Sequence, residues 1–232
     1  MTDITVNSAD GGAFSAYRAD PAAGTGPGLL VIQEIFGVNK VMRDICNGLA
    51  EQGYVALCPD LFWRQEPNVR LTDQTDQEWQ RAFELMQGFD EAKGIDDLKA
   101  SLAALRTTDG CTGRAGTIGF CLGGRLAYLM AARSDADCNV GYYPVGIENN
   151  LGEAIGITRP LLLHIAEEDG FVPKDAQARI NSSLGSNPNV RIHNYPGVDH
   201  AFARPGGKNH DAAAAENANG RTAAFLAANL RD

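Results

Sequence analysis

The residue with the clearest chemical potential in this sequence is a cysteine set among glycines. Cys121 lies in the run GFCLGG, residues 119–124, between an apolar segment with strand character and a helical segment. Glycines two positions before and after a central residue allow a sharp strand-to-helix turn that exposes that residue. The N–H groups that begin the following helix could hold an oxyanion. The pattern predicts a nucleophile elbow with a thiol for acyl transfer; the alternative is an inert cysteine buried in a glycine-rich turn.

An acid and a histidine follow this cysteine in the order that a catalytic triad of this kind requires. Asp169 comes just after a buried strand and before a glycine, and His200 lies in a glycine-containing loop after the next strand. Glu167 or Glu168 could serve as the acid instead, and the acid could also be a solvated loop carboxylate or a helix N-cap. We expect the acid, the histidine and the thiol to meet at one edge of a sheet.

The other histidines suit a structural or exposed position better. His164 and His193 lie inside predicted strands, and His210 lies in a hydrophilic stretch near the last helix. In the predicted triad, His200 takes or shares the thiol proton and later activates water, while the acid fixes its tautomer and the thiol attacks a carbonyl. A thiolate is also a good leaving group, so activated esters and lactones suit it better than amides. We therefore expect an ester or lactone hydrolase.

The elements that must position these groups alternate along the whole chain. Strands are predicted at 4–7, 13–19, 28–33, 54–58, 115–120, 139–143, 160–165 and 190–195, and helices at 39–52, 77–88, 91–105, 122–132, 174–184 and 211–230. The polar, proline-containing stretch 60–76 is expected to form an excursion above the sheet. Such alternation predicts an α/β fold with a mostly parallel sheet covered by helices on both faces. The length favours a single domain over residues 1–232.

Composition argues against several classes of partner. Twenty basic residues against twenty-nine acidic ones give a net charge of −9, which disfavours nucleic acid and anionic membrane surfaces. Residues 1–10 carry two acidic and no basic side chains, unlike a secretory signal, and the apolar run 28–32 is too short to span a bilayer. Five cysteines, an odd number without metal-ligand spacing, indicate reduced thiols in a cytoplasm and no metal site.

Several motifs together resemble one known family. GFCLGG at 119–124, QEIFG at 33–37 and CPDL at 58–61, with the loops of Asp169 and His200, are similar to those of dienelactone hydrolases (carboxymethylenebutenolidases) over nearly the full chain. The cysteine elbow combined with QEIFG is far more specific than either motif alone. The resemblance implies the α/β-hydrolase fold. It also implies an enzyme that opens dienelactone to maleylacetate in the bacterial breakdown of chlorinated aromatics, without a metal or an organic cofactor.

The resemblance implies roles for residues outside the triad as well. By the matching motif, Glu34 is the carboxylate that contacts the cysteine and helps to activate it, and the N–H groups of Ile35 and Leu122 form the oxyanion hole. Arg204, shortly after the histidine, would hold a carboxylate of the substrate. From its residue type alone, Glu34 ends a buried apolar strand and needs a partner there, which an ordinary salt bridge could also supply.

The chain departs from the family at one position. A second carboxylate-binding arginine of the family falls on the helix expected at 77–88, where alignment places Trp79. Arg81 lies two residues along, and a two-residue step turns a helix by about 200°, so Arg81 would face elsewhere unless the register shifts. Arg64, in the preceding excursion, is a further candidate, although a solvated loop arginine is the simpler interpretation. The substrate could therefore differ from dienelactone.

The favoured substrate is thus a small ester or lactone that carries a carboxylate. Two alternatives to this function remain open. One keeps the chemistry in a general carboxylesterase or thioesterase, with an apolar pocket lined by Phe36, Trp63, Trp79 and Phe202. The chain is expected to be a monomer or a weak homo-oligomer in either case.

The other alternative is a non-catalytic binding or thiol-redox protein. In it, Cys121 is oxidised rather than acylated, and Cys46 or Cys138 should lie near it as a resolving thiol. The presence of both His200 and Asp169 argues against this alternative, because a peroxide sensor needs neither.

Overall fold

The structure divides into two compact units. The computed structural model describes residues 2–231 of the 232, and the chain groups into Met1–Ala115 and Gly116–Asp232. Strand β5 (Cys111–Phe120) begins in the first unit and ends in the second. A single domain over 1–232 stays a prediction, and residues 1 and 232 of that range lie outside the described residues. Among residues 2–231, no helix is both long and apolar enough to cross a membrane.

The first unit holds a mixed sheet with one parallel pair. Its strands are β1 (Thr2–Asn7), β2 (Ala13–Ala19), β3 (Gly26–Ile32) and β4 (Val55–Pro59), in the order β1-β2-β4-β3. β3 and β4 pair in parallel, whereas β1 and β2 pair antiparallel, as do β2 and β4. Every residue of β3 and β4 is buried, as is typical of parallel strands covered on both faces.

Capping side chains set where the helices of this unit begin. The helices α1 (Lys40–Glu51), α2 (Asp76–Gln87) and α3 (Glu91–Thr107) follow Asn39, Thr75 and Asp90, respectively. Each of these three side chains accepts a hydrogen bond from a backbone N–H group in the first turn of its helix. With α1 between the parallel strands β3 and β4, these three elements form a βαβ unit.

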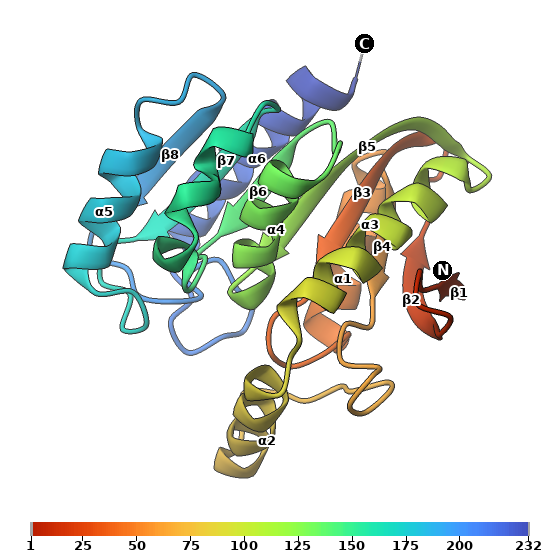
Figure 1. Cartoon of the computed structure of the whole chain (residues 1–232), viewed down its shortest axis with the longest axis horizontal. Helices are drawn as coiled ribbons and strands as arrows, with labels where there is room; N and C mark the ends of the chain where they lie inside the picture. The colour runs from red at the N-terminus through yellow and green to blue at the C-terminus, as the bar shows by residue number, and fades with distance from the viewer. Residues whose placement is uncertain (1, 232) are drawn as a thin grey trace. The chain divides into compact units, whose positions relative to one another are not determined.

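The second unit is a parallel sheet covered on two faces. β5 is followed by β6 (Asn139–Tyr142), β7 (Leu161–Ala166) and β8 (Val190–Tyr195), in the order β5-β6-β7-β8. All three pairings are parallel. Figure 1 shows α4 (Leu122–Arg133) and α5 (Lys174–Leu184) on one face of these strands and α6 (Ala212–Leu230) on the other. The predicted mostly parallel α/β architecture is therefore confirmed.

Differences from the sequence-based elements are local. Residues 147–156, expected as loop, form two short 3-10 helices, η1 (Ile147–Asn149) and η2 (Leu151–Gly156). α1 begins one residue later than predicted because Asn39 has extended backbone angles and acts as the cap. Neither difference moves a candidate residue from one element to another.

The carboxyl ends of three strands in the second unit lead into the candidate residues. Cys121 follows β5 directly, Asp169 lies three residues after β7, and His200 lies five residues after β8. Because β5, β6, β7 and β8 are parallel, these ends lie at the same edge of the sheet. The fold thus brings one thiol, one carboxylate and one imidazole to one edge.

Candidate functional site

The turn at Cys121 has the strained geometry expected of a nucleophile elbow. Cys121 has φ 56° and ψ −116°, in a region that L-residues seldom occupy and that costs conformational energy. Two backbone hydrogen bonds hold it: its N–H donates to the Tyr142 carbonyl at 3.1 Å, and its carbonyl accepts from the Arg125 N–H at 3.1 Å. The backbone of Cys121 is therefore fixed between the end of β5 and the start of α4, and the residue is partly exposed.

At two of the surrounding glycines there is no space for a side chain. A Cβ atom on Gly119 would lie 1.9 Å from the Gly123 carbonyl oxygen, and one on Gly124 would lie 2.6 Å from the Tyr142 carbonyl oxygen. Both contacts are with backbone atoms, so no side-chain rotation would relieve them. The GFCLGG run therefore lets α4 pack closely against β5 and β6, which places the helix N-terminus directly after the thiol-bearing residue.

Asp169 is the acid that pairs with the histidine. His200 Nδ1 lies 2.9 Å from Asp169 Oδ2, and both side chains are buried. The other carboxylate oxygen of Asp169 accepts a hydrogen bond from the Phe171 N–H at 2.9 Å. Of the two alternative acids, Glu168 is exposed and pairs with Lys174 at 2.9 Å. Within residues 2–231, His200 forms its ion pair with Asp169 and with neither glutamate.

The imidazole of His200 is also coupled to the thiol. Burial acts to lower the pKa of His200, but the negative charge of the Cys121 thiolate, the hydrogen bonds with Asp169 and Cys121, and the charge of Asp169 outweigh it and raise the pKa to about 10. The three candidate triad residues are therefore in mutual contact through the imidazole. A ring with this pKa is protonated at neutral pH while the thiolate is present.

Two aromatic rings that the sequence analysis did not single out flank the imidazole. Tyr143 packs edge-on against His200 with centroids 5.1 Å apart, and Phe171 does so from another side at 4.8 Å. Tyr143 has a positive φ of 36° at the end of β6, and Phe171 is 47% exposed. Neither the type nor the spacing of these residues indicates this contact in the sequence.

The QEIFG segment after β3 belongs to the first unit and is buried. Gln33 Nε2 donates to the Glu34 carbonyl, and Gln33 Oε1 accepts from the Leu61 N–H, which ties this segment to the CPDL segment after β4. Glu34 is 2% exposed, and Ile35 and Phe36 are also buried. Cys121 and Leu122 lie in the second unit, so the predicted activation by Glu34 and the predicted oxyanion hole stay predictions.

Trp79, rather than Arg81, lies beside the QEIFG segment. The Trp79 ring packs edge-on against Phe36 with centroids 4.9 Å apart. Arg81 is directed elsewhere on α2 and donates to Glu66 at 2.6 Å and to Glu84 at 2.9 Å at the surface. The cation of Arg81 is thus already balanced by two carboxylates, and its predicted role in substrate binding has no further support from this geometry.

Arg64, the other candidate anchor, belongs to a charged network in the first unit. Its guanidinium contacts Asp97 at 3.0 Å and Asp10 at 2.8 Å, donates to Ser8, and lies 4.3 Å from the centre of the Trp63 ring. Trp63 Nε1 also donates to Asp97 at 2.9 Å. These contacts give Arg64 a structural role in holding the excursion after β4.

Arg204 and the remaining histidines lie in the second unit. Arg204 is 4% exposed and follows His200 on the same loop, where its N–H donates to the Ala201 carbonyl. His164 is fully buried and bonded to Tyr195 and to a threonine of α6, and burial lowers its pKa to about 3. His164 is therefore structural, as its place inside a strand indicates.

These features define a class of protein. A residue in an unusual backbone conformation between a parallel strand and a helix, with an acid and a histidine on two later loops in that order, is the arrangement by which α/β-hydrolases present their nucleophile. The fold and the elbow together place this chain among the α/β-hydrolases.

Comparison with known proteins narrows this class to one family. The model of the "Dienelactone hydrolase family" matches residues 14–230. A "Putative carboxymethylenebutenolidase" of Azospirillum brasilense is 54% identical over 232 residues, covering 99% of this chain and 100% of that protein. The carboxymethylenebutenolidase of Pseudomonas putida is 40% identical over 224 residues, covering 97% of this chain and 95% of that protein. The chain belongs to the dienelactone hydrolase family and is a carboxylic ester hydrolase.

A solved structure supports the fold assignment. The crystal structure named as a "Putative Dienelactone Hydrolase" from Klebsiella pneumoniae matches with a TM-score of 0.83 at 27% sequence identity, covering 98% of this chain and 99% of that one. The α/β-hydrolase fold implied by the sequence motifs is therefore confirmed.

Proposed function

We propose that this enzyme opens a lactone or enol ester, with dienelactone as substrate and maleylacetate as product, by acyl transfer to Cys121. One observation carries the proposal: the His200 imidazole contacts the Asp169 carboxylate at 2.9 Å, and its interactions with Cys121 and Asp169 raise its pKa to about 10. Membership in a family whose relatives are named carboxymethylenebutenolidases supports the substrate class.

The raised pKa of His200 favours a defined sequence of proton transfers. The Cys121 thiolate attacks the carbonyl carbon, an S–C bond forms, and the ring C–O bond breaks. Because acylation removes the thiolate charge, it removes one of the influences that raise the pKa of His200. The imidazolium can then give its proton to the departing enolate oxygen and become neutral.

The neutral imidazole is the base for the second half of the reaction. His200 takes a proton from water, the hydroxide adds to the thioester carbon, and the S–C bond breaks to release a carboxylic acid and the thiolate. As the thiolate charge returns, the imidazole is again held in its protonated form. Asp169 fixes the Nδ1–H tautomer throughout, so that Nε2 can serve the reacting atoms.

The remaining residues complete the proposed site. Leu122 is the first residue of α4, and N–H groups in a first helical turn have no partner within the helix, so its N–H suits an oxyanion. The N–H of Ile35 supplies the second donor in this proposal, Glu34 helps to activate the thiol, and Arg204 holds the substrate carboxylate.

A second candidate, a general small-ester hydrolase, is favoured by the surroundings of Trp79. An aromatic ring packs against Phe36 where the family arginine was expected, and Arg81 is balanced by Glu66 and Glu84. An apolar wall of this kind would suit a neutral acyl or alcohol group. The two candidates share the acyl-transfer chemistry and differ in what holds the substrate.

Replacing Arg204 distinguishes the two candidates. We expect Arg204→Gln to lower kcat/KM for dienelactone by about 10- to 100-fold, the effect of losing a charge-assisted hydrogen bond. Hydrolysis of a neutral aryl ester, 4-nitrophenyl acetate, should change by less than about threefold, because it has no carboxylate. The test compares steady-state kinetics on both substrates. Equal losses on both would contradict the proposed carboxylate contact, and faster turnover of the neutral ester would favour the general esterase.

The thiol-redox alternative finds little support in the cysteines. Burial, and then a hydrogen bond with Cys58, raise the pKa of Cys46 well above its usual range, and burial raises that of Cys138 to about 12. Neither would readily form the thiolate that a resolving cysteine needs. The cytoplasmic location inferred from five thiols stays part of the proposal.

A further inference from the structure

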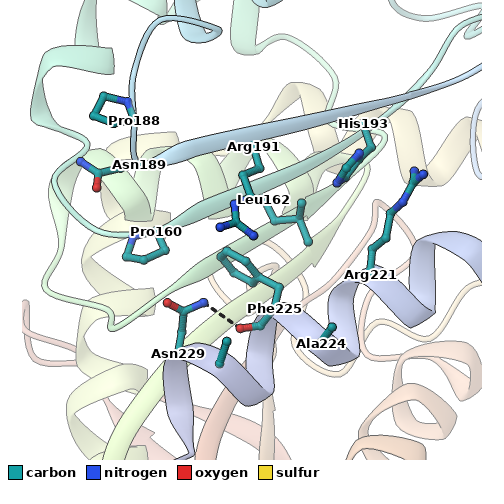
Figure 2. Close-up of a pocket in the computed structure, with 11 residues that line it drawn as sticks. Pro160, Leu162, Pro188, Asn189, Arg191, His193, Arg221, Ala224, Phe225 and Asn229 are labelled. Atoms are coloured by element: carbon teal, nitrogen blue, oxygen red, sulfur yellow. Dashed lines mark hydrogen bonds between the residues drawn. The ribbon is translucent and has the colours of Figure 1, made fainter.

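A cavity lies in the Gly116–Asp232 unit, away from the triad residues. It has a volume of about 360 Å³ and lies between β7, β8 and α6. Figure 2 shows its lining side chains, and none of the three triad residues is among them. Its apolar side comes from Leu162 on β7 and from Ala224, Phe225 and Ala228 on α6.

Sheet register and helix periodicity bring the lining residues together. Arg191 pairs with Leu162 across β8 and β7, and His193 lies two residues further on the same face of β8. On α6, Arg221 lies three and four residues before Ala224 and Phe225, so all three share one helix face. Figure 2 shows Arg191 and His193 on β8 and Arg221 on α6 around the cavity.

The cavity is cationic in a chain of net charge −9. Among residues 2–231, no aspartate or glutamate lines it. Among the ion pairs of residues 2–231, none involves Arg191 or Arg221. Arg221 donates one hydrogen bond to the Tyr195 hydroxyl at 3.1 Å. The cavity therefore has two guanidinium groups without carboxylate partners beside an apolar wall. A bound anion would balance their charge.

We propose that this cavity binds a small organic anion, with a carboxylate between Arg191 and Arg221 and an apolar body against Leu162 and Phe225. Its volume is at the lower end of the range of small-molecule sites, which suits a single ring with a short acidic chain. The site is separate from the proposed reaction centre, so its occupant need be neither substrate nor product.

His193 reports on occupancy of the cavity. Burial lowers its pKa, and the charges of Arg221 and Arg191 lower it further. The neighbouring His164 on β7 stays neutral at working pH because burial lowers its pKa to about 3. An anion between the arginines would offset their charges, so the pKa of His193 should rise when the site is filled.

The test uses 3-phenylpropionate as the probe and 3-phenylpropionamide as its neutral match. NMR of the imidazole C–H groups follows His193 and His200 separately during titration of the whole chain. We expect a saturable shift of the His193 signal with the acid, a rise in its pKa at saturation, and at least about tenfold weaker binding of the amide. Binding at the reaction centre alone would instead shift the His200 signal.

Arginine variants complete the test. Arg191→Gln and Arg221→Gln should each weaken binding by about tenfold or more, whereas Arg179→Gln, an exposed change on α5, should leave it unchanged. The melting temperature of each variant shows that it is folded, and its ester hydrolysis should match that of the unmodified chain. Absence of a saturable His193 shift, equal binding of the amide, or unchanged affinity in both variants would overturn the proposal.

A different observation points to a further residue of the proposed triad. Asp199 Oδ1 accepts hydrogen bonds from the Gly170 N–H at 2.9 Å and from the His200 N–H at 2.6 Å. Its other oxygen accepts from Asn209 at 3.3 Å. One carboxylate therefore ties the loop after β7, which carries Asp169, to the loop after β8.

We infer that Asp199 is a positioning residue, an inference that rests on the proposed function. It does not contact the reacting atoms; it keeps the two loops in the register that the bond between Asp169 and His200 requires. Without it, the imidazole would lose part of its hydrogen bonding to Asp169, and the influences that raise its pKa would weaken.

Three variants test this role. Asp199→Ala should lower kcat about tenfold or more with little change in KM, and it should lower the pKa of His200 measured by NMR. Asp199→Asn retains an accepting oxygen and should recover most of the kcat and most of the His200 pKa. Glu216→Ala, which removes an exposed acid on α6, should change neither kcat nor the His200 pKa. A kcat within about twofold and an unchanged His200 pKa in Asp199→Ala would overturn the inference. If the triad proposal itself is wrong, Cys121→Ala will remain active. The pKa of His200 in Asp199→Ala will still show whether Asp199 holds the two loops together.

Discussion

Cys121→Ala is expected to lower kcat/KM for ester or lactone hydrolysis by about 10³-fold or more, because no other group can form the acyl intermediate. Alanine has the same Cβ as cysteine, so the substitution adds no strain at φ 56°. The melting temperature should therefore change little. Steady-state kinetics with purified protein, together with thermal unfolding, measure both effects.

Two further measurements make this prediction specific to the mechanism. Removing the thiol also removes its charge and its hydrogen bond to His200, so the pKa of His200 in Cys121→Ala should fall well below about 10. Cys121→Ser supplies a nucleophile of the same shape that ionises far less readily, and we expect much weaker activity than in the unmodified chain. Near-normal turnover in Cys121→Ala would refute acyl transfer to sulfur.

Local residue patterns predicted the elements that position the site. The strands Ala13–Ala19 and Val190–Tyr195 and the helix Lys174–Leu184 have the bounds expected from the sequence. Their apolar residues recur with the period of the element, and turn or loop residues follow directly. The elbow was predictable for a related reason: glycine is required where a Cβ would meet backbone atoms, and the GFCLGG run concentrates such positions.

What could not be predicted depends on contacts between distant segments. Tyr143 and Phe171 meet His200 only because three loops converge after β6, β7 and β8. One of the two partners of Arg81 is Glu66, fifteen residues away along an irregular excursion whose path no periodic pattern specifies. For Asp199, its place beside His200 is visible in the sequence, but its bond to the Gly170 N–H is not.

The choice among three neighbouring acids shows the same limit. Glu167, Glu168 and Asp169 follow one strand in succession, and side-chain type alone does not separate them. The backbone after β7 turns so that Glu168 points to Lys174 at the surface while Asp169 points inward to His200. Position within the turn, rather than acidity, distinguishes the acid of the triad.

Asp169→Asn should reduce kcat/KM by about 10³- to 10⁴-fold with little loss of stability, because the amide keeps the shape of the side chain but not its charge. Asparagine can accept the Nδ1–H bond or donate to Nδ1, and donation would stabilise the wrong imidazole tautomer. Loss of the carboxylate also removes two of the influences that raise the pKa of His200, its hydrogen bond and its charge. We therefore expect a lower pKa for His200 by NMR. At neutral pH, a larger share of the imidazole would then be neutral and unable to protonate the departing enolate.

Glu168→Gln, one residue earlier but paired with Lys174 at the surface, is the matched control and should leave activity unchanged. Full activity in Asp169→Asn, or an equal loss in Glu168→Gln, would show that the buried pair of Asp169 and His200 is not the proton relay of this enzyme.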